Sequence, residues 1–195
     1  MKQRKQLKVS FNSPVILTFS AICLVSLLLN YLTQGLSNRL VFSVYRSSFA
    51  DPLTYLRFFG HVVGHANWEH LMGNMMLILI VGPLLEEKYG SQDILLVILT
   101  TALVTGLTNF IFFPHVQLLG ASGVVFAFIL LSSLTSLEDG KIPMTFLLVA
   151  VIYIGEQIYQ GLFLHDNVSN LTHILGGIVG SVLGFFMNKV RKPTW

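Results

Sequence analysis

The sequence predicts an all-α integral membrane protein, a bundle of six transmembrane helices with both termini in the cytoplasm. Apolar residues make up 53% of the 195 residues and charged residues only 11%, less than half of the roughly 25% in an average soluble domain. The mean hydropathy is +0.71, and six stretches approach the about 20 apolar residues that a bilayer-spanning helix needs. This composition argues against a soluble enzyme, a secreted disulfide scaffold and a disordered tail.

The first predicted span runs from Pro14 to about Leu32. Ser13 is a suitable N-cap, and Pro14 suits the first helical position because an N–H there would have no partner within the helix. The basic residues before this span resemble the start of a signal peptide. No small-residue cleavage site follows them, so we expect a retained span. The other five predicted spans cover residues 69–85, 93–113, 119–137, 143–164 and 168–188, with boundaries good to several residues.

The distribution of Lys and Arg predicts the orientation. Of the 12 basic residues, nine lie in segments on the side of the two termini, and the remaining three are Arg39, Arg46 and Arg57. Cytoplasmic loops carry the excess of positive charge, so both termini are predicted to be cytoplasmic, as a basic tail over residues 1–13 and a second tail over residues 189–195. The net charge of +3 is modest, and the Lys and Arg residues lie almost entirely in short loops and tails. This distribution indicates membrane topology and no nucleic-acid partner.

Residues 34–68 form the one long connection, a predicted outer loop. It mixes charged residues with many aromatic and aliphatic ones, a composition typical of a segment that lies in the membrane interface. The sequence shows no internal repeat and no second domain. We therefore expect a single membrane domain over residues 1–195.

Six polar residues predicted at membrane depth are candidates for function, because such side chains are costly in lipid: Asn109, Glu156 and the four residues considered next. His70 and Asn74 are four residues apart and share one face of the second span, near its outer end. Ser122 stands at the outer start of the fourth span, and His173 about five residues into the sixth. The topology, assigned from charge alone, places all four side chains at a similar depth.

The sixth span can approach the fourth closely. Gly176, Gly180 and Gly184 form a four-residue ladder, and His173 lies on the same stripe. Small residues let helix backbones approach in lipid, and Gly120 and Gly123 flank the serine on the other side. Close approach matters because a serine and its base must come within about 2.6–3.2 Å.

These residue types point to acyl transfer to water. A serine hydroxyl becomes a nucleophile when a base removes its proton, and His173 is the available base for Ser122. No acidic residue in the span lies beside His173, which predicts a Ser–His dyad. His70, Asn74 and the backbone N–H of Ser122 are candidate donors to the oxyanion.

At these residues the chain resembles the rhomboid family of intramembrane serine proteases. Gly120-Ala121-Ser122-Gly123 is similar to the family's G-x-S-G nucleophile motif, and His70 to Asn74 to its H-x-x-x-N motif. His173 with its following glycines resembles the family's last helix. The resemblance covers residues 55–185, and further landmarks are His61, His65 and Glu86.

The resemblance implies a six-helix core with a water-filled cavity open to the outer face, a Ser122–His173 dyad, and His70 and Asn74 in the oxyanion site. It implies transmembrane protein substrates that enter laterally past the fifth span, in a bacterial plasma (inner) membrane, with no cofactor. Two positions depart from the family pattern. Phe126 stands where many members have Tyr, and the common Trp-Arg pair reads Leu56-Arg57.

Three alternatives stay open at this point. A catalytically silent rhomboid-like protein would bind membrane clients, but that class typically lacks the serine or the histidine. A small transporter could be built around Glu156, although broken helices and inverted repeats are not visible in the sequence. A metal site at His61, His65 and His70 is disfavoured because the H-E-x-x-H pattern is absent and no carboxylate stands at ligand spacing.

Overall fold

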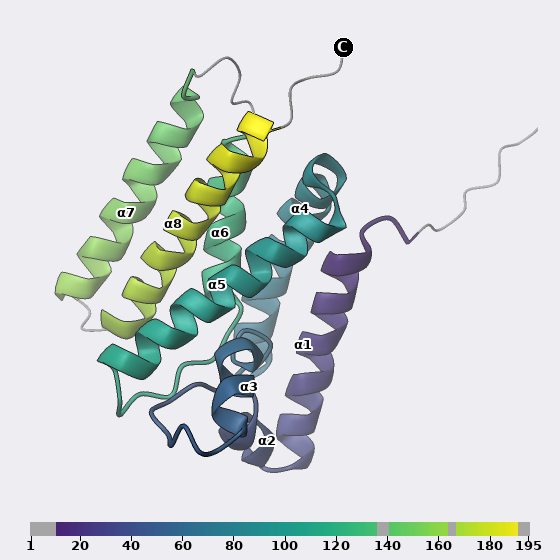
Figure 1. Cartoon of the computed structure of the whole chain (residues 1–195), viewed down its shortest axis with the longest axis vertical. Helices are drawn as coiled ribbons and strands as arrows, with labels where there is room; N and C mark the ends of the chain where they lie inside the picture. Colours follow the sequence, from purple (N-terminus) through teal and green to yellow (C-terminus); the bar gives the residue numbers. More distant parts are fainter. Residues whose placement is uncertain (1–10, 136–140, 164–166, 191–195) are drawn as a thin grey trace, which may run out of the picture.

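The computed structural model describes residues 11–135, 141–163 and 167–190. Within these ranges the chain is helical and contains no strand, which confirms the predicted fold class; an isolated β-bridge joins Val44 and Leu118. The helices of the described residues, labelled in Figure 1, are α1 (Pro14–Leu32), α2 (Leu36–Leu40), α3 (Leu53–Gly60), α4 (Trp68–Tyr89), α5 (Ser91–Phe112), α6 (Ser122–Ser133), α7 (Met144–Phe163) and α8 (Asn167–Val190).

The long helices fall on the six predicted spans. Four of them are long and apolar enough to cross a membrane: α1, α4, α5 and residues 170–188 of α8. The apolar segments Ser122–Ser133 and Met144–Tyr159 are shorter, so six crossings and cytoplasmic termini stay predictions. Of the two predicted tails, residues 1–10 and 191–195 lie outside the described residues.

Two parts of the chain differ from the sequence prediction. The long connection over residues 34–68 is not a plain loop, because it contains the short helices α2 and α3. Helix α6 begins at Ser122, three residues later than predicted. Gly120 has a φ of +131°, outside the helical range, and its N–H donates to the carbonyl oxygen of His61 at 2.9 Å. These contacts with another segment hold the residues before Ser122 out of the helix.

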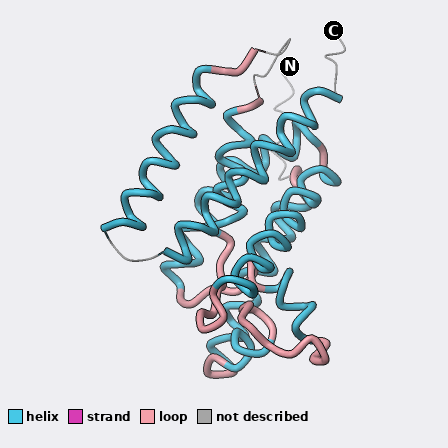
Figure 2. The backbone as a smooth tube through the Cα atoms, turned by 60° about the vertical axis from the view of Figure 1, so that its left-hand side comes forward, coloured by secondary structure: helices cyan, strands magenta, loops and turns pink. Residues whose placement is uncertain are grey.

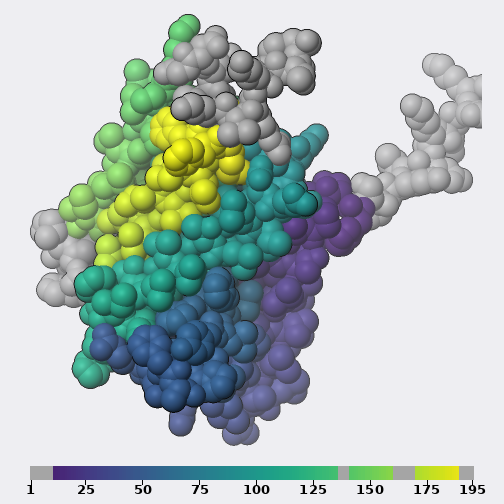
Figure 3. All heavy atoms as spheres, viewed as in Figure 1, coloured from purple at the N-terminus to yellow at the C-terminus, as the bar shows by residue number. Residues whose placement is uncertain are grey.

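Helices α6 and α8 form the most extensive contact of the bundle, and α8 also packs on α5. Helix α1 packs on α4, while α7 lies at the opposite edge, against α8 and α6 (Figure 1). Most of the loops and turns gather at one end of the bundle (Figure 2), the end where Figure 1 shows α2 and α3. In the space-filling view, α2 and α3 cover that end (Figure 3).

The glycine ladder packs as predicted. A Cβ atom added at Gly176 would overlap the backbone carbonyl oxygen of Gly123, and one added at Gly180 would overlap that of Ala127. At Gly184 the added atom would lie 2.9 Å from a side-chain carbon of Leu131. Backbone therefore meets backbone between α8 and α6, and larger residues at the first two positions would force the helices apart.

Glu86 joins α4 to the start of α1. Its carboxylate accepts hydrogen bonds from the backbone N–H groups of Val15 and Ile16, both at 3.0 Å, and from the hydroxyl of Ser91 at 2.7 Å. The first N–H groups of a helix have no partner within the helix. A buried carboxylate at that end satisfies two of them and complements the helix dipole.

Arg57 holds the segment over residues 34–68 together. Its guanidinium pairs with Asp51 at 3.0 Å, donates to the carbonyl oxygen of Leu40 at 2.8 Å, and stacks over the ring of Tyr45. Only 3% of Arg57 is exposed. The segment is therefore a packed part of the bundle, and it is anchored by the arginine of the Leu56-Arg57 pair.

Candidate active site

Ser122 is the first residue of α6 and is partly buried. The loop before it is fixed by other segments. Val44 and Leu118 exchange backbone hydrogen bonds of 2.9 and 3.0 Å, and the side-chain amide of Asn109 donates to the carbonyl oxygens of Val44 and Val116. The hydroxyl of Ser122 thus stands at a helix N-terminus, where free N–H groups and the positive end of the helix dipole favour negative charge.

His173 lies on α8, one turn before the close contact of Gly176 with Gly123. Its ring packs on that of Phe126, one turn after Ser122, with centroids 4.4 Å apart. Phenylalanine at position 126 therefore supports the histidine ring through a ring contact, without the hydroxyl that a tyrosine would add. Since Gly123 follows Ser122 directly, the backbone contact brings the serine and the histidine to one junction of α6 and α8.

His70 and Asn74 lie over the loop that precedes Ser122. A Cβ atom added at Gly120 would be 2.7 Å from Nε2 of His70 and 4.0 Å from Nδ2 of Asn74. Helix α4 presents both residues from its first turns, and its start is capped by Asn67, whose side chain accepts the N–H of His70 at 2.8 Å. The structure therefore brings the predicted pair to the backbone beside the predicted nucleophile.

His65 orients Asn74. Its Nδ1 lies 3.1 Å from the carbonyl oxygen of Val63, an acceptor, so Nδ1 carries the proton and Nε2 accepts from the amide of Asn74 at 3.2 Å. Burial, and then the neighbouring His70, lower the pKa of His65 to about 4, so the ring is neutral at pH 7. One N–H of Asn74 is used in this bond, and the second is free to bind another acceptor.

His61 supports the loop before Ser122, and its ring contacts Thr105 of α5. It is 1% exposed, with Nε2 3.1 Å from the hydroxyl oxygen of Thr105, and its backbone carbonyl accepts the N–H of Gly120. Burial lowers its pKa to about 4. Within the described residues, no group of three or more His, Cys, Asp or Glu side chains could hold a metal ion.

Gln157 is a residue of the site that sequence reasoning missed. Its side-chain oxygen lies 2.9 Å from Nδ1 of His173, and it is 3% exposed on α7. Its neighbour Glu156, which drew attention as a mid-span carboxylate, is exposed. An available signal was the spacing of Gln157 and Tyr153, four residues apart, which places them on one face of a helix.

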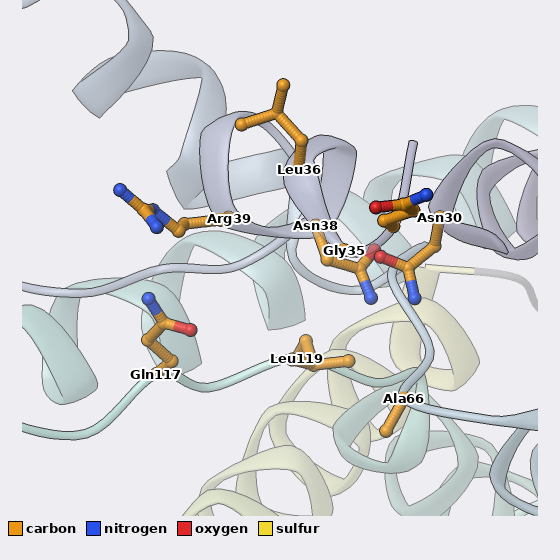
Figure 4. Close-up of a pocket in the computed structure, with 9 residues that line it drawn as sticks. Asn30, Gly35, Leu36, Asn38, Arg39, Ala66, Gln117 and Leu119 are labelled. Carbon is orange, nitrogen blue, oxygen red and sulfur yellow. The ribbon is translucent and has the colours of Figure 1, made fainter. Parts of the chain in front are cut away.

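A cavity of about 480 Å³ lies beside the loop that leads to Ser122. Figure 4 shows polar side chains that line it from the end of α1 (Asn30), from α2 (Asn38 and Arg39) and from the loop itself (Gln117). Gln34 lines it as well. The side-chain oxygens of Asn30 and Asn38 are buried and form no hydrogen bond to the described residues. Side-chain amide groups beside the candidate site are therefore available to hydrogen-bond with water or with a bound polypeptide.

Comparisons with known proteins identify the family of the chain. A sequence model of the rhomboid domain matches residues 52–190. The chain is 28% identical to Rhomboid-related protein 2 of Mus musculus over 156 residues, which are 69% of this chain and 51% of that protein. It is 25% identical to Rhomboid protease GlpG of Haemophilus influenzae over 185 residues, 91% and 93% of the two chains.

A third relative is Rhomboid protease GluP of Bacillus subtilis, 29% identical over 130 residues, 64% of this chain and 24% of that protein. The chain spans about half the length of the mouse relative and nearly all of the Haemophilus one. The rhomboid-domain match covers well over half of the chain and includes Ser122, His173, His70 and Asn74. This chain is an integral, multi-pass membrane protein and belongs to the rhomboid family.

Proposed function

We propose that the chain is an intramembrane serine endopeptidase, which hydrolyses peptide bonds in or near the outer end of transmembrane segments. Ser122 is the nucleophile and His173 the general base. The observation that carries the proposal is the junction of α6 and α8, where Gly176 packs on the backbone of Gly123. A serine at a helix start and a histidine one turn from that contact have the positions that a dyad needs.

In the proposed reaction, the hydroxyl oxygen of Ser122 attacks the carbonyl carbon of the substrate while its proton passes to Nε2 of His173. The tetrahedral intermediate collapses as the imidazolium gives that proton to the leaving amine, and the C–N bond breaks. Water then hydrolyses the acyl-enzyme ester, again with His173 as base and then as acid. The cycle returns Ser122 and His173 to their starting states.

Three donors are proposed to bind the oxyanion. The backbone N–H of Ser122 belongs to the first turn of α6 and has no acceptor within the helix. Asn74 has one N–H free after its bond to His65, and His70 lies beside Gly120. Each such donor contributes about 10²–10³ in kcat in a serine protease.

The proposed domain extends beyond the matched residues to include α1, because α1 packs on α4 and receives the carboxylate of Glu86. The proposed location is a bacterial plasma (inner) membrane, with both termini cytoplasmic and the active site open to the outer face. The distribution of basic residues supports this orientation. Transmembrane proteins are the proposed substrates, since the bundle is immersed in lipid.

The test is labelling of purified protein with a fluorophosphonate probe, followed by cleavage of a transmembrane substrate in liposomes. Wild type is expected to react in both assays, and Ser122→Ala and His173→Ala in neither. Ser133→Ala is the matched control, since the Ser133 hydroxyl only donates to the carbonyl oxygen of Leu130 on the same helix. Asn74→Ala is expected to lower turnover by about 10- to 1000-fold.

Two results would overturn the proposal. Cleavage that persists in folded Ser122→Ala would remove the dyad assignment. A folded wild type that neither reacts with the probe nor cleaves any transmembrane substrate would favour the client-binding alternative.

A further inference from the structure

We infer that Gln157 is a positioning residue, which holds His173 in the tautomer that can accept the serine proton. This inference deepens the proposed function and rests on it. In the dyad, Nε2 of the histidine must carry a lone pair, so Nδ1 must carry the proton. The geometry supplies an acceptor for that proton, because the side-chain oxygen of Gln157 lies 2.9 Å from Nδ1 of His173.

The hydrogen bond is well placed to act in the reaction. Gln157 is 3% exposed, so water competes little for its oxygen. When His173 takes the serine proton it becomes an imidazolium, and a hydrogen bond from a charged donor is roughly twice as strong as one between neutral groups. The oxygen of Gln157 therefore stabilises the charge that develops on the base, in the way that the acidic residue of a catalytic triad does.

Packing fixes the two partners independently of the bond. The ring of Phe126 lies between those of Tyr153 and His173, with centroid distances of 4.3 and 4.4 Å. Tyr153 and Gln157 are buried on the same face of α7, while neighbouring residues such as Ile152 and Ile158 are exposed. Phe126 thus sets the plane of the histidine ring, and Gln157 selects which nitrogen is protonated.

The size of the effect follows from what a wrong tautomer costs. In serine proteases, a substitution that favours the wrong histidine tautomer lowers kcat by about 10⁴. Gln157→Met leaves a mixture of tautomers and also loses the hydrogen bond to the imidazolium, so we expect a smaller loss than this, of about 10- to 100-fold. As an ionised carboxylate, the side chain in Gln157→Glu accepts from Nδ1–H and cannot donate to Nδ1, so this variant is expected to retain the rate.

The experiment combines a rate with a direct reading of the tautomer. Fluorophosphonate labelling rates are measured for wild type, Gln157→Met and Gln157→Glu, with Ile158→Met as the control that puts the same side chain at the adjacent, exposed position of α7. The two-bond ¹H–¹⁵N correlations of ¹⁵N-histidine-labelled protein then identify the protonated nitrogen of His173, whose signals are those missing in His173→Ala. Thermal midpoints show whether each variant is folded.

We expect Nδ1–H in wild type and in Gln157→Glu, and a mixture or Nε2–H in Gln157→Met, which alone should react slowly. A wild-type ring protonated at Nε2, or a folded Gln157→Met with the wild-type tautomer and rate, would overturn the inference. The tautomer is read without substrate. A wild type that carries Nδ1–H but cleaves nothing would therefore refute the proposed function and leave the positioning of His173 intact.

Discussion

Substitution of Gly176 by alanine tests whether the backbone contact of α8 with α6 builds the site. The added Cβ would overlap the carbonyl oxygen of Gly123, a backbone atom that cannot turn aside. The helices must then separate by about 1 Å to reach van der Waals distance. Ser122 adjoins Gly123, and His173 is one turn from Gly176, so the same movement separates the proposed nucleophile from the proposed base.

Two magnitudes follow. Overpacking of this kind lowers the free energy of unfolding by about 2–3 kcal/mol. The higher helix propensity of alanine raises it by about 1 kcal/mol. The net loss of about 1–2 kcal/mol corresponds to a fall of about 2–8 °C in the thermal midpoint of a chain of this size. A misplacement of about 1 Å at a reacting centre can lower the rate about 10²-fold. We therefore expect Gly176→Ala to stay folded at the assay temperature but to lose most of its turnover.

The matched control is Gly155→Ala on α7, where an added Cβ would meet nothing within 4 Å. It is expected to keep the wild-type rate and to raise the midpoint slightly, because only the gain in helix propensity remains. Thermal unfolding in detergent and cleavage of a transmembrane substrate are measured for both variants. If Gly176→Ala behaves like Gly155→Ala in both assays, the backbone contact does not position the dyad.

Three further predictions concern the surroundings of the site. In the native protein His61 and His65 have a pKa of about 4 and stay neutral above it, whereas the same side chains in the unfolded chain take up protons below about pH 6.5. Lowering the pH through this window therefore lowers the free energy of unfolding, by about 2 kcal/mol for each histidine at pH 5. A thermal midpoint that is the same at pH 7 and pH 5 would refute this prediction. Glu86→Gln leaves an N–H at the start of α1 without an acceptor, which costs about 1–3 kcal/mol and should lower the thermal midpoint by about 2–12 °C. Glu87→Gln, at the exposed neighbouring position, should leave the midpoint unchanged. Gly120→Ala places a side chain at a φ of +131° and against His70, and it should abolish cleavage while far-UV circular dichroism stays helical.

The helices and the two proposed catalytic residues were predictable because their signals are local. An apolar run such as Pro14–Leu32 needs a helix to satisfy its backbone in lipid. The depth of Ser122 and of His173 follows from counting residues along two such runs. The glycine ladder was equally readable, because a four-residue spacing puts Gly176 and Gly180 on one face.

The start of α6 and the role of Gln157 could not be predicted because their causes are distant in sequence. The loop before Ser122 is held by Val44 and by the carbonyl of His61, which belong to another segment. Gln157 is recognised as part of the site only when α7 is docked on α8, so that its oxygen meets His173. The periodicity of a sequence predicts which face of a helix is buried, but it does not predict which atoms of another helix contact that face.

The candidate site therefore depends on two kinds of contact, a backbone contact between α8 and α6 and a side-chain contact between α7 and α8. The distance between Ser122 and His173 is set where backbone meets backbone at Gly176 and Gly180, and such a contact leaves no side chain to adjust. The proposed tautomer of His173 is set by one amide on α7, an edge helix that packs only against α8 and α6 among the principal contacts of the described residues. A displacement of α7 would leave the proposed dyad assembled and remove the acceptor at Nδ1 of His173. Variants at the glycines should thus lower both stability and rate, whereas variants at Gln157 should lower the rate alone.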